Sequence, residues 1–406
     1  TTEIYTLSLH DALPIYPFFL TEQDKRQIES LGITEERIGA QIALFKRGTQ
    51  YIRISRPCTI GDGIAQIESE EREKFLRLYE EHGRSRKMVK FVPASGAATR
   101  MFKALHVVSS AHPILELAEM QKLASFQDES YLDFLEFAEN LERYAFYPRL
   151  KTGMTQAGVD IERERERGDF TRIVAYLLQE KGLGALPKAL IPFHRYPGQV
   201  RTPIEEHLAE AIEYTKDRDG KCRIHFTLPE SHEREMKEAI DRWAKEMEDS
   251  SGVTLEIGAS LQSPSTHTIM LDESDRPVRD ENENLLFRPA GHGALIENLN
   301  ELDADIVFIK NIDNVVPDWH RTDTSLYKKL LAGYLIECQE KIFQFLDRLK
   351  SAKAETGEVQ EMVLFAQRMG ILSEDLPGTV ERLIDRLDRP LRRSEERRVG
   401  KECRSR

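Results

Sequence analysis

Short β-rich runs alternate with helical patterns between residues 186 and 317, and this alternation restricts the possible folds more than any other feature of the sequence. Strands that alternate with helices are typical of a parallel, doubly wound sheet. An earlier apolar run at 91–93 precedes this region. We therefore predict an α/β fold, with a mixed, mostly parallel sheet and helices on both faces. The predicted strands lie at 189–193, 222–228, 254–257, 268–271 and 305–310.

Helical patterns surround this region and divide the chain. We expect a helical N-terminal segment at 16–86, an α/β domain at 87–320 with a helical insertion at about 107–185, and a helical C-terminal segment at 321–393. In the last segment, apolar residues recur at steps of four along one helix face, which indicates packing. These residues are Leu326, Leu330, Tyr334, Cys338, Ile342 and Leu346.

The two ends of the chain differ from the rest. Residues 1–15 and 394–406 resemble translated sequencing-adapter sequence, so we exclude both from the fold prediction. We expect the natural protein to be truncated here, with part of a C-terminal domain missing beyond about Arg393.

Charge and cysteine content narrow the classes of partner. A net charge of -12 and a sequence pI near 5.6 argue against a nucleic-acid binder with many phosphate contacts and favour small ligands. The cysteines are widely spaced, so we expect neither a disulfide framework nor a zinc site. The sequence contains neither an apolar stretch of membrane-spanning length nor a secretory signal, so we expect a cytoplasmic protein. The cysteines are Cys58, Cys222, Cys338 and Cys403.

The apolar run at 91–93 ends in small residues and then enters a helical pattern. Ser, Gly and Ala leave room for backbone N–H groups to reach an anion, and the start of a helix favours negative charge. Arg100 adds a positive charge at the end of this loop. The segment predicts phosphate binding, and its alternative is a plain structural turn. The candidate nucleotide-binding residues are Ala94, Ser95, Gly96, Ala97 and Thr99.

Three further segments place polar groups beside predicted strands. Asp313 follows the last predicted strand, where a carboxylate can hold Mg²⁺ together with substrate phosphates or close an Asx turn. Lys188 precedes the first predicted strand, at 189–193. Its ammonium can neutralise phosphate oxygens there, and the alternative is an ordinary solvated lysine. His292 lies between Gly291 and Gly293. These glycines would let a ligand approach closely, and the alternative is that the three residues form an ordinary turn.

In their order along the chain, these segments resemble motifs of the sugar nucleotidyltransferase superfamily, and most closely its uridylyltransferase branch, the UDP-sugar pyrophosphorylases. The glycine-rich L-x-G-G-x-G-T-R-L/M loop of that family corresponds to 93–101, and its P-K-x-L-x-P element to 187–192. The chain is also similar to a bacterial family of unknown function over most of residues 16–392. The other matches are T-S-x-x-T-H, loosely, at 227–232, Q-x-P at 262–264, P-x-G-H/N-G at 289–293 and N-x-D-N at 311–314.

The resemblance implies a fold and a reaction. The fold would be a Rossmann-like nucleotidyltransferase domain of the GT-A-like kind. The reaction would be the Mg²⁺-dependent transfer of a uridylyl group from UTP to a sugar 1-phosphate, which gives a UDP-sugar and pyrophosphate. Nucleic acid and membranes would not be partners, and the oligomeric state is left open.

The resemblance also implies two groups of site residues. Arg100, Lys188 and Asp313 would be the catalytic residues, with the two cations binding phosphate and Asp313 holding Mg²⁺. Gln262 and the backbone of Gly291 would read the uracil edge. His292 would lie near the α-phosphate or the sugar, and the remaining nucleotide-binding residues would be Ala94, Ser95, Gly96, Ala97, Thr99 and Gly293.

Departures from the family pattern leave two alternatives. Ser95 and Ala98 stand where the family has glycines, which leaves less room for a triphosphate and favours a catalytically inactive nucleotide-sugar binding protein. A nucleotide-sugar-dependent glycosyltransferase is the other alternative, because Asp303-Ala304-Asp305 matches a D-x-D motif. These aspartates precede a predicted strand, so we expect them at its amino end, away from ligands. His225 and His232 are interpreted as structural or capping residues.

Overall fold

The structure, a computed structural model, is made of two compact units. The first comprises Thr1–Gln66 with Gln262–Asn298, and the second comprises Ile67–Leu261 with Leu299–Arg406. The residues that the structure describes are 20–48, 54, 56–96, 98, 101–124, 128–179, 182–288, 292–351, 353–371 and 380–388, without the side chains of 292 and 293.

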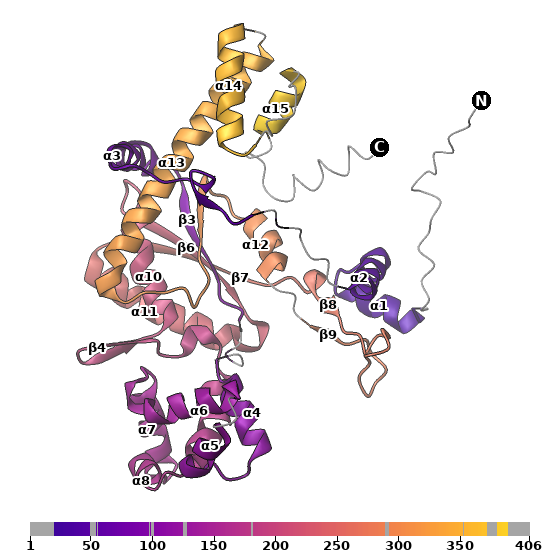
Figure 1. Ribbon diagram of the computed structural model, residues 1–406, viewed down its shortest axis with the longest axis vertical. Helices are drawn as coiled ribbons and strands as arrows, with labels where there is room; N and C mark the ends of the chain where they lie inside the picture. The colour runs from indigo at the N-terminus through magenta and orange to yellow at the C-terminus, as the bar shows by residue number, and fades with distance from the viewer. Residues whose placement is uncertain are drawn as a thin grey trace. The chain divides into compact units, whose positions relative to one another are not determined.

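A four-stranded parallel sheet forms the centre of the second unit (Figure 1). Its order is β10 (Ile306–Ile309), β3 (Met88–Pro93), β6 (Lys221–Leu228) and β7 (Thr254–Leu261). Of these four strands, β3 comes first in the sequence and lies inside the sheet: the chain first builds the sheet outward through β6 and β7, and then returns to add β10 on the other side of β3. This reversal makes the carboxyl edge between β3 and β10 a topological switch point. The prediction of an α/β fold with a parallel sheet is confirmed.

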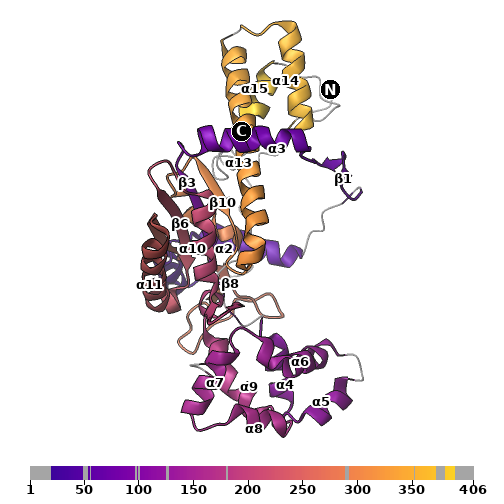
Figure 2. The same ribbon diagram turned by 90° about the vertical axis from the view of Figure 1, so that its left-hand side faces the viewer.

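Three long helices cover one face of this sheet: α10 (Pro203–Tyr214), α11 (Glu233–Ser251) and α13 (Asp318–Lys350) (Figures 1 and 2). Alternate side chains of each strand point to this face because the side-chain period of a strand is two. The helix-facing core contains Val92, Ile224 and Phe226 from the strands, with Leu208 and Ile240 from the helices.

Helices α4 to α9 occupy the predicted insertion and have a hydrophobic core of their own. Phe134, Leu141 and Leu177 are fully buried in that core. The two ends of the insertion meet, because the backbone N–H of Lys188 donates to the carbonyl of Gly96 at 3.4 Å. The helices are α4 (Lys103–Ala111), α5 (Leu117–Ala124), α6 (Glu129–Glu139), α7 (Tyr147–Gln156), α8 (Ile161–Glu166) and α9 (Thr171–Leu178).

The first unit joins segments that are far apart in the sequence. Helices α1 (Glu22–Ser30) and α2 (Glu35–Arg47) pack against an antiparallel pair of short strands, and Ile28, Ile38, Ile269 and Leu285 form their common core. Asp24 is fully buried and forms an ion pair with Arg279 at 2.8 Å. The strands of this unit are β1 (Thr59–Ile60), β2 (Gly63–Ile64), β8 (Thr268–Ile269) and β9 (Phe287–Arg288).

The C-terminal part of the second unit is helical. Helix α13 packs against α3 (Ser69–Leu78), and α14 (Thr356–Arg368) and α15 (Val380–Asp388) form a further core with its C-terminal half. Along the predicted apolar row, Leu330, Cys338, Ile342 and Leu346 are buried, as expected for packing residues. Among the described helices, none combines the length and apolar character that crossing a membrane requires.

Two predicted strands were wrong in kind or in place. Residues 189–193 do not form a strand of the sheet: a 3-10 helix covers Lys188–Leu190, and a hairpin of β4 (His194–Tyr196) and β5 (Gln199–Arg201) follows it. Pro187 precedes this run and Pro192 lies within it, and a proline lacks the N–H that a sheet strand must donate. The run at 268–271 contributes β8 to a small antiparallel pair instead of the parallel sheet.

Candidate functional site

The segments that follow β3 and β10 meet the last residues of β6 and β3 at the carboxyl edge of the sheet. The backbone N–H of Ala94 donates to the carbonyl and to the hydroxyl of Thr227, at 3.0 and 3.2 Å. The backbone N–H of Ile312 donates to the carbonyl of Pro93 at 3.1 Å. Ala94 is fully buried. The small-residue loop predicted from the sequence therefore begins at the switch point of the sheet.

Lys188 and Asp313 form an ion pair at this edge. The Lys188 Nζ lies 2.6 Å from the Asp313 Oδ2, although 125 positions separate the two residues in the sequence. The Lys188 side chain is 17% exposed and that of Asp313 is 38% exposed. Since the backbone of Lys188 also bonds to Gly96, the structure brings together three predicted site residues, one from each of three segments. We call Gly96, Lys188 and Asp313 the edge site.

His207 of α10 fixes the turn that carries Asp313. Its side chain is fully buried, and its Nε2 lies 3.1 Å from the carbonyl of Asn311 and 3.2 Å from that of Ile312. Burial, together with the nearby positive charges of Lys90 and Lys310, holds the pKa of His207 well below its usual value. The ring is therefore neutral, and its Nε2 carries the hydrogen because both partners are acceptors.

Removing the His207 donor should destabilise this turn. We expect His207→Leu to lower the free energy of unfolding by about 1–3 kcal/mol, because two backbone carbonyls lose their partner. His207→Gln retains an N–H donor and should recover part of that loss. Urea denaturation of the three proteins measures both effects. A Leu variant as stable as the parent would show that the contact contributes nothing.

A group of buried charges lies behind the edge site, between the sheet and α10. The fully buried Lys90 of β3 lies 3.2 Å from the Glu210 carboxylate, and Lys310 lies 2.6 Å from it. The Tyr214 hydroxyl donates to Glu210 at 2.7 Å. Burial lowers the pKa of Lys90 to about 7, against the opposing effect of Glu210. Burial alone would raise the pKa of Glu210, but the two lysines outweigh it and the pKa is lowered.

A second polar cluster, which no sequence motif indicates, joins the β4–β5 hairpin to the first turns of α10 and α13. Glu206 is almost fully buried, and its Oε1 accepts a hydrogen bond from the Tyr196 hydroxyl at 2.6 Å and lies 3.0 Å from the His194 Nδ1. Arg201 donates to Asp318 at 2.6 Å. These residues fit no motif. The sequence offers one indication: Glu206 and Asp318 closely follow Thr-Pro and Val-Pro pairs, which are typical of the start of a helix.

Apart from Ala94 and Ser95, the other predicted site residues belong to the first unit or lie outside the described residues. Gln262 belongs to the first unit, where its Nε2 donates to the Thr266 hydroxyl at 3.3 Å. His292 and Gly293 also belong to that unit, in a 3-10 helix at His292–Leu295 that leads into α12 (Ile296–Asn300). The predicted residues Ala97, Thr99, Arg100 and Gly291 lie outside the described residues.

The D-x-D aspartates lie at the opposite edge. Asp305 accepts a hydrogen bond from the backbone N–H of Lys87 at 2.7 Å, and Asp303 pairs with the Lys87 ammonium at 2.9 Å. Lys87 directly precedes β3, so both aspartates lie at the amino end of the sheet, as expected. His225 lies 2.8 Å from the Ser260 hydroxyl and stacks on Phe91, which fits a structural role.

The edge site contains one carboxylate, that of Asp313, so it suits Mg²⁺ only when phosphates supply further ligands. No group of three or more His, Cys, Asp or Glu side chains that could hold a metal is found among the described residues. Mg²⁺, however, is commonly held by one or two carboxylates while phosphates and water complete its shell. The half-exposed Asp313 carboxylate fits that arrangement.

The fold and the edge site define the class: this is an α/β protein whose parallel sheet carries a cation–carboxylate pair at its switch point. The chain belongs to the family described as a domain of unknown function (DUF4301), whose model matches residues 21–394. No curated protein and no solved structure gives a significant match.

Proposed function

We propose that the protein is a Mg²⁺-dependent nucleotidyltransferase that transfers a uridylyl group from UTP to a sugar 1-phosphate. The observation that carries the proposal is the meeting of Gly96, Lys188 and Asp313 at the carboxyl edge between β3 and β10. Ligands of open α/β sheets bind at such switch points. The choice of uridylyl transfer comes from the motif resemblance, which spans the loop after β3, the Lys188 segment and the Asp313 segment.

The proposed reaction is a displacement at phosphorus. An oxygen of the sugar 1-phosphate attacks the α-phosphorus of UTP, and the bond to the pyrophosphate oxygen breaks. Such a reaction needs alignment and charge neutralisation more than a protein nucleophile. The backbone N–H groups of Ser95 and Gly96 and the ammonium of Lys188 would hold phosphate oxygens. Bound Mg²⁺, held by Asp313, would supply further charge neutralisation.

The ion pair would change partners when substrate binds. Lys188 would exchange the Asp313 carboxylate for a phosphate, and Asp313 would exchange the ammonium for the metal. Both side chains are partly exposed, so neither exchange requires the core to open. In the absence of nucleotide, the pair keeps both groups neutralised.

A pyrophosphate-release assay tests the proposal. We expect release with UTP, Mg²⁺ and at least one sugar 1-phosphate, and little release with the other nucleoside triphosphates. The assay should cover a panel of sugar 1-phosphates. Absence of release with every pair would remove the proposed activity.

Lys188 should discriminate between charged and uncharged ligands. We expect Lys188→Ala to weaken UTP binding by about tenfold or more, because a charge-assisted contact to phosphate is lost. Uridine, which has no phosphate, should bind equally well to both proteins. Calorimetric titration of each ligand measures this difference. An equal loss for UTP and uridine would argue that Lys188 has no phosphate-binding role.

A catalytically inactive nucleotide-sugar binding protein is the second candidate, and the sequence of the phosphate loop favours it. Ser95 and Ala98 replace family glycines, and Ala98 is buried in the core of the insertion. A side chain at these positions narrows the space for a triphosphate. This candidate is distinguished by tight binding of UDP-sugar without pyrophosphate release. The glycosyltransferase alternative is disfavoured, because its two motif aspartates lie at the amino edge of the sheet.

A further inference from the structure

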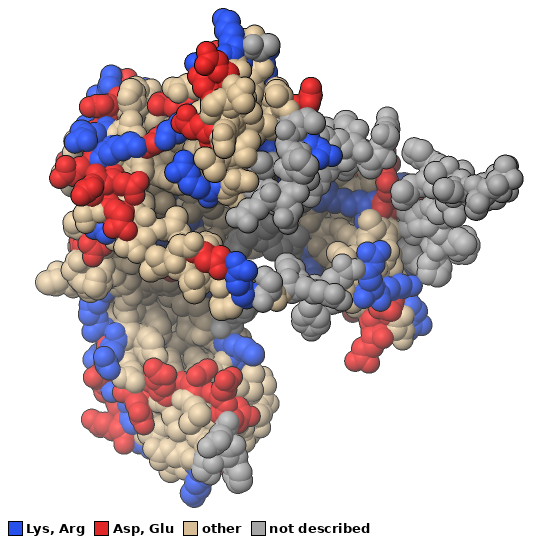
Figure 3. Space-filling model, turned by 45° about the horizontal axis from the view of Figure 1, so that its top comes forward, with Lys and Arg blue, Asp and Glu red and all other residues tan. Residues whose placement is uncertain are grey.

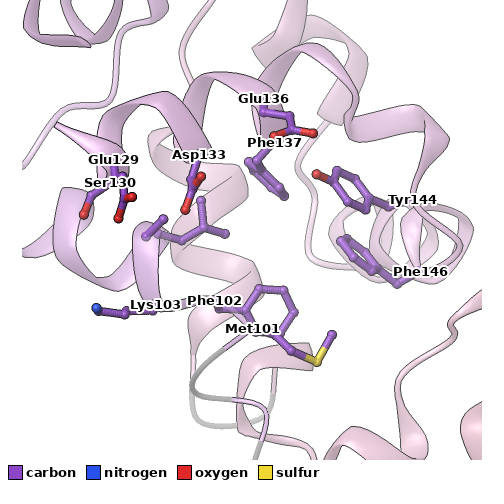
Figure 4. A pocket seen from close by; sticks show the side chains of 12 residues that line it. Met101, Phe102, Lys103, Glu129, Ser130, Asp133, Glu136, Phe137, Tyr144 and Phe146 are labelled. Atoms are coloured by element: carbon purple, nitrogen blue, oxygen red, sulfur yellow. The ribbon is translucent and has the colours of Figure 1, made fainter. Parts of the chain in front are cut away.

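The helical insertion contains a cavity that the proposed reaction does not use. Its volume is about 390 Å³, which is the size of a small-molecule pocket. It lies between the first turn of α4 and one face of α6, and the segment after α6 closes one side (Figure 4). All of these elements belong to the second unit.

Aromatic rings form one wall of the cavity. Tyr144 and Phe146 are stacked with their ring centroids 5.1 Å apart, and Phe137 packs on Tyr144 at 5.8 Å. Phe102 meets Phe146 edge to face at 6.1 Å. Phe102, Phe137 and Phe146 are nearly buried, so the wall is a fixed part of the insertion core. Aromatic rings attract cations and cover aliphatic chains.

Carboxylates form the opposite rim. Glu129, Asp133 and Glu136 all line the cavity from α6, and Figure 4 shows them in a row along that helix. None of the three forms an ion pair with a described residue. Acidic side chains also gather over the insertion on the face seen in Figure 3. One ammonium, that of Lys103, lines the same cavity, so negative charge is in excess.

The carboxylates change the pKa of Tyr144, a residue of the aromatic wall. Burial raises the pKa of the Tyr144 hydroxyl, and the charges of Glu136 and Asp133 raise it further. The negative field therefore extends across the cavity from the rim to the rings. A nucleotide or another polyanion would be repelled here, whereas a cation would be attracted from both sides.

The spacing of the rim points to a ligand with more than one positive charge. Residues rise about 1.5 Å each along an α-helix, so the carboxylates of 129, 133 and 136 extend over about 10 Å. A linear polyamine carries ammonium groups at short methylene intervals, and its methylenes can lie against aromatic rings. We propose that this cavity binds a linear polyamine, with its ammonium groups at the α6 carboxylates and its methylenes on the rings of Phe102, Tyr144 and Phe146.

Calorimetric titration with spermidine tests this proposal. We expect the intact chain to bind spermidine and to bind butylamine at least about tenfold more weakly, because a single ammonium meets fewer carboxylates. The double variant Asp133→Asn with Glu136→Gln should weaken spermidine binding by about tenfold or more. Lys103→Ala should strengthen it, since the competing cation is removed. Circular dichroism of each variant checks that the insertion remains folded.

Glu139→Gln serves as the matched control. Glu139 is an exposed carboxylate on the same helix and does not line the cavity, so its loss should leave spermidine affinity unchanged. The proposal is overturned if spermidine produces no binding signal, if the double variant binds as tightly as the parent, or if butylamine binds as tightly as spermidine. The titration contains no nucleotide, so its failure would leave the proposed uridylyl transfer untouched.

Discussion

Asp313→Ala should abolish pyrophosphate release while the protein stays folded. We expect at least about a 100-fold loss of activity, since a carboxylate that holds the metal and its phosphates supplies several kcal/mol of transition-state stabilisation. The Asp313 side chain is 38% exposed and lies at the end of a strand, so its removal leaves the core intact. The assay is steady-state pyrophosphate release with UTP and the best sugar 1-phosphate, together with a thermal unfolding scan.

Asp303→Ala is the matched control for this experiment. Asp303 is also paired with a lysine, but it lies at the amino edge and is 95% exposed. Its loss should leave the activity unchanged. Equal activity in the Asp313 variant would remove Asp313 from the mechanism, whereas a large loss in the Asp303 variant would favour the D-x-D glycosyltransferase alternative.

Glu210→Gln should have the largest effect on stability. The Glu210 carboxylate is the shared partner of Lys90 and Lys310, and the Lys90 ammonium is fully buried. Glutamine cannot neutralise either lysine, and breaking a buried pair on one side costs about 3–5 kcal/mol of unfolding free energy. Urea denaturation measures the change.

The control for Glu210 is its neighbour on the exposed side of α10. Glu213 is exposed and forms none of these contacts, so Glu213→Gln should change the unfolding free energy by less than about 0.5 kcal/mol. If both variants lose the same amount, the buried charges behind the edge site are not held by Glu210.

The strands of the parallel sheet were predictable because their sequences combine a high strand propensity with the apolar character that burial in a sheet requires. The runs that became β6 and β10 are rich in β-branched and apolar residues and lie between helical patterns. The run at 189–193 is just as apolar, but Pro192 within it and Pro187 before it interrupt the pattern of backbone donors. Ala189 and Ile191 are apolar because they are buried in cores to which helices contribute. The local sequence cannot distinguish this kind of burial from burial as a strand of the sheet.

The candidate site was predictable where it follows strands. The small residues from Ala94 come directly after β3, and Asp313 lies four residues after the end of β10, so both are predictable from the rule that ligands collect at such ends. The hairpin cluster of Tyr196, Glu206 and Asp318 was not predictable, because its members come from separate elements and share no spacing. Gln262 belongs to a segment that packs with α1 and α2, a pairing that depends on long-range contacts alone.

The most direct measurement of the central claim is a crystal structure with UTP and Mn²⁺, in which the metal is located by its anomalous scattering. We expect the metal to be bonded to the Asp313 carboxylate and the Lys188 ammonium to contact a phosphate oxygen beside Gly96. A triphosphate bound elsewhere, with the pair between Lys188 and Asp313 still intact, would contradict the account.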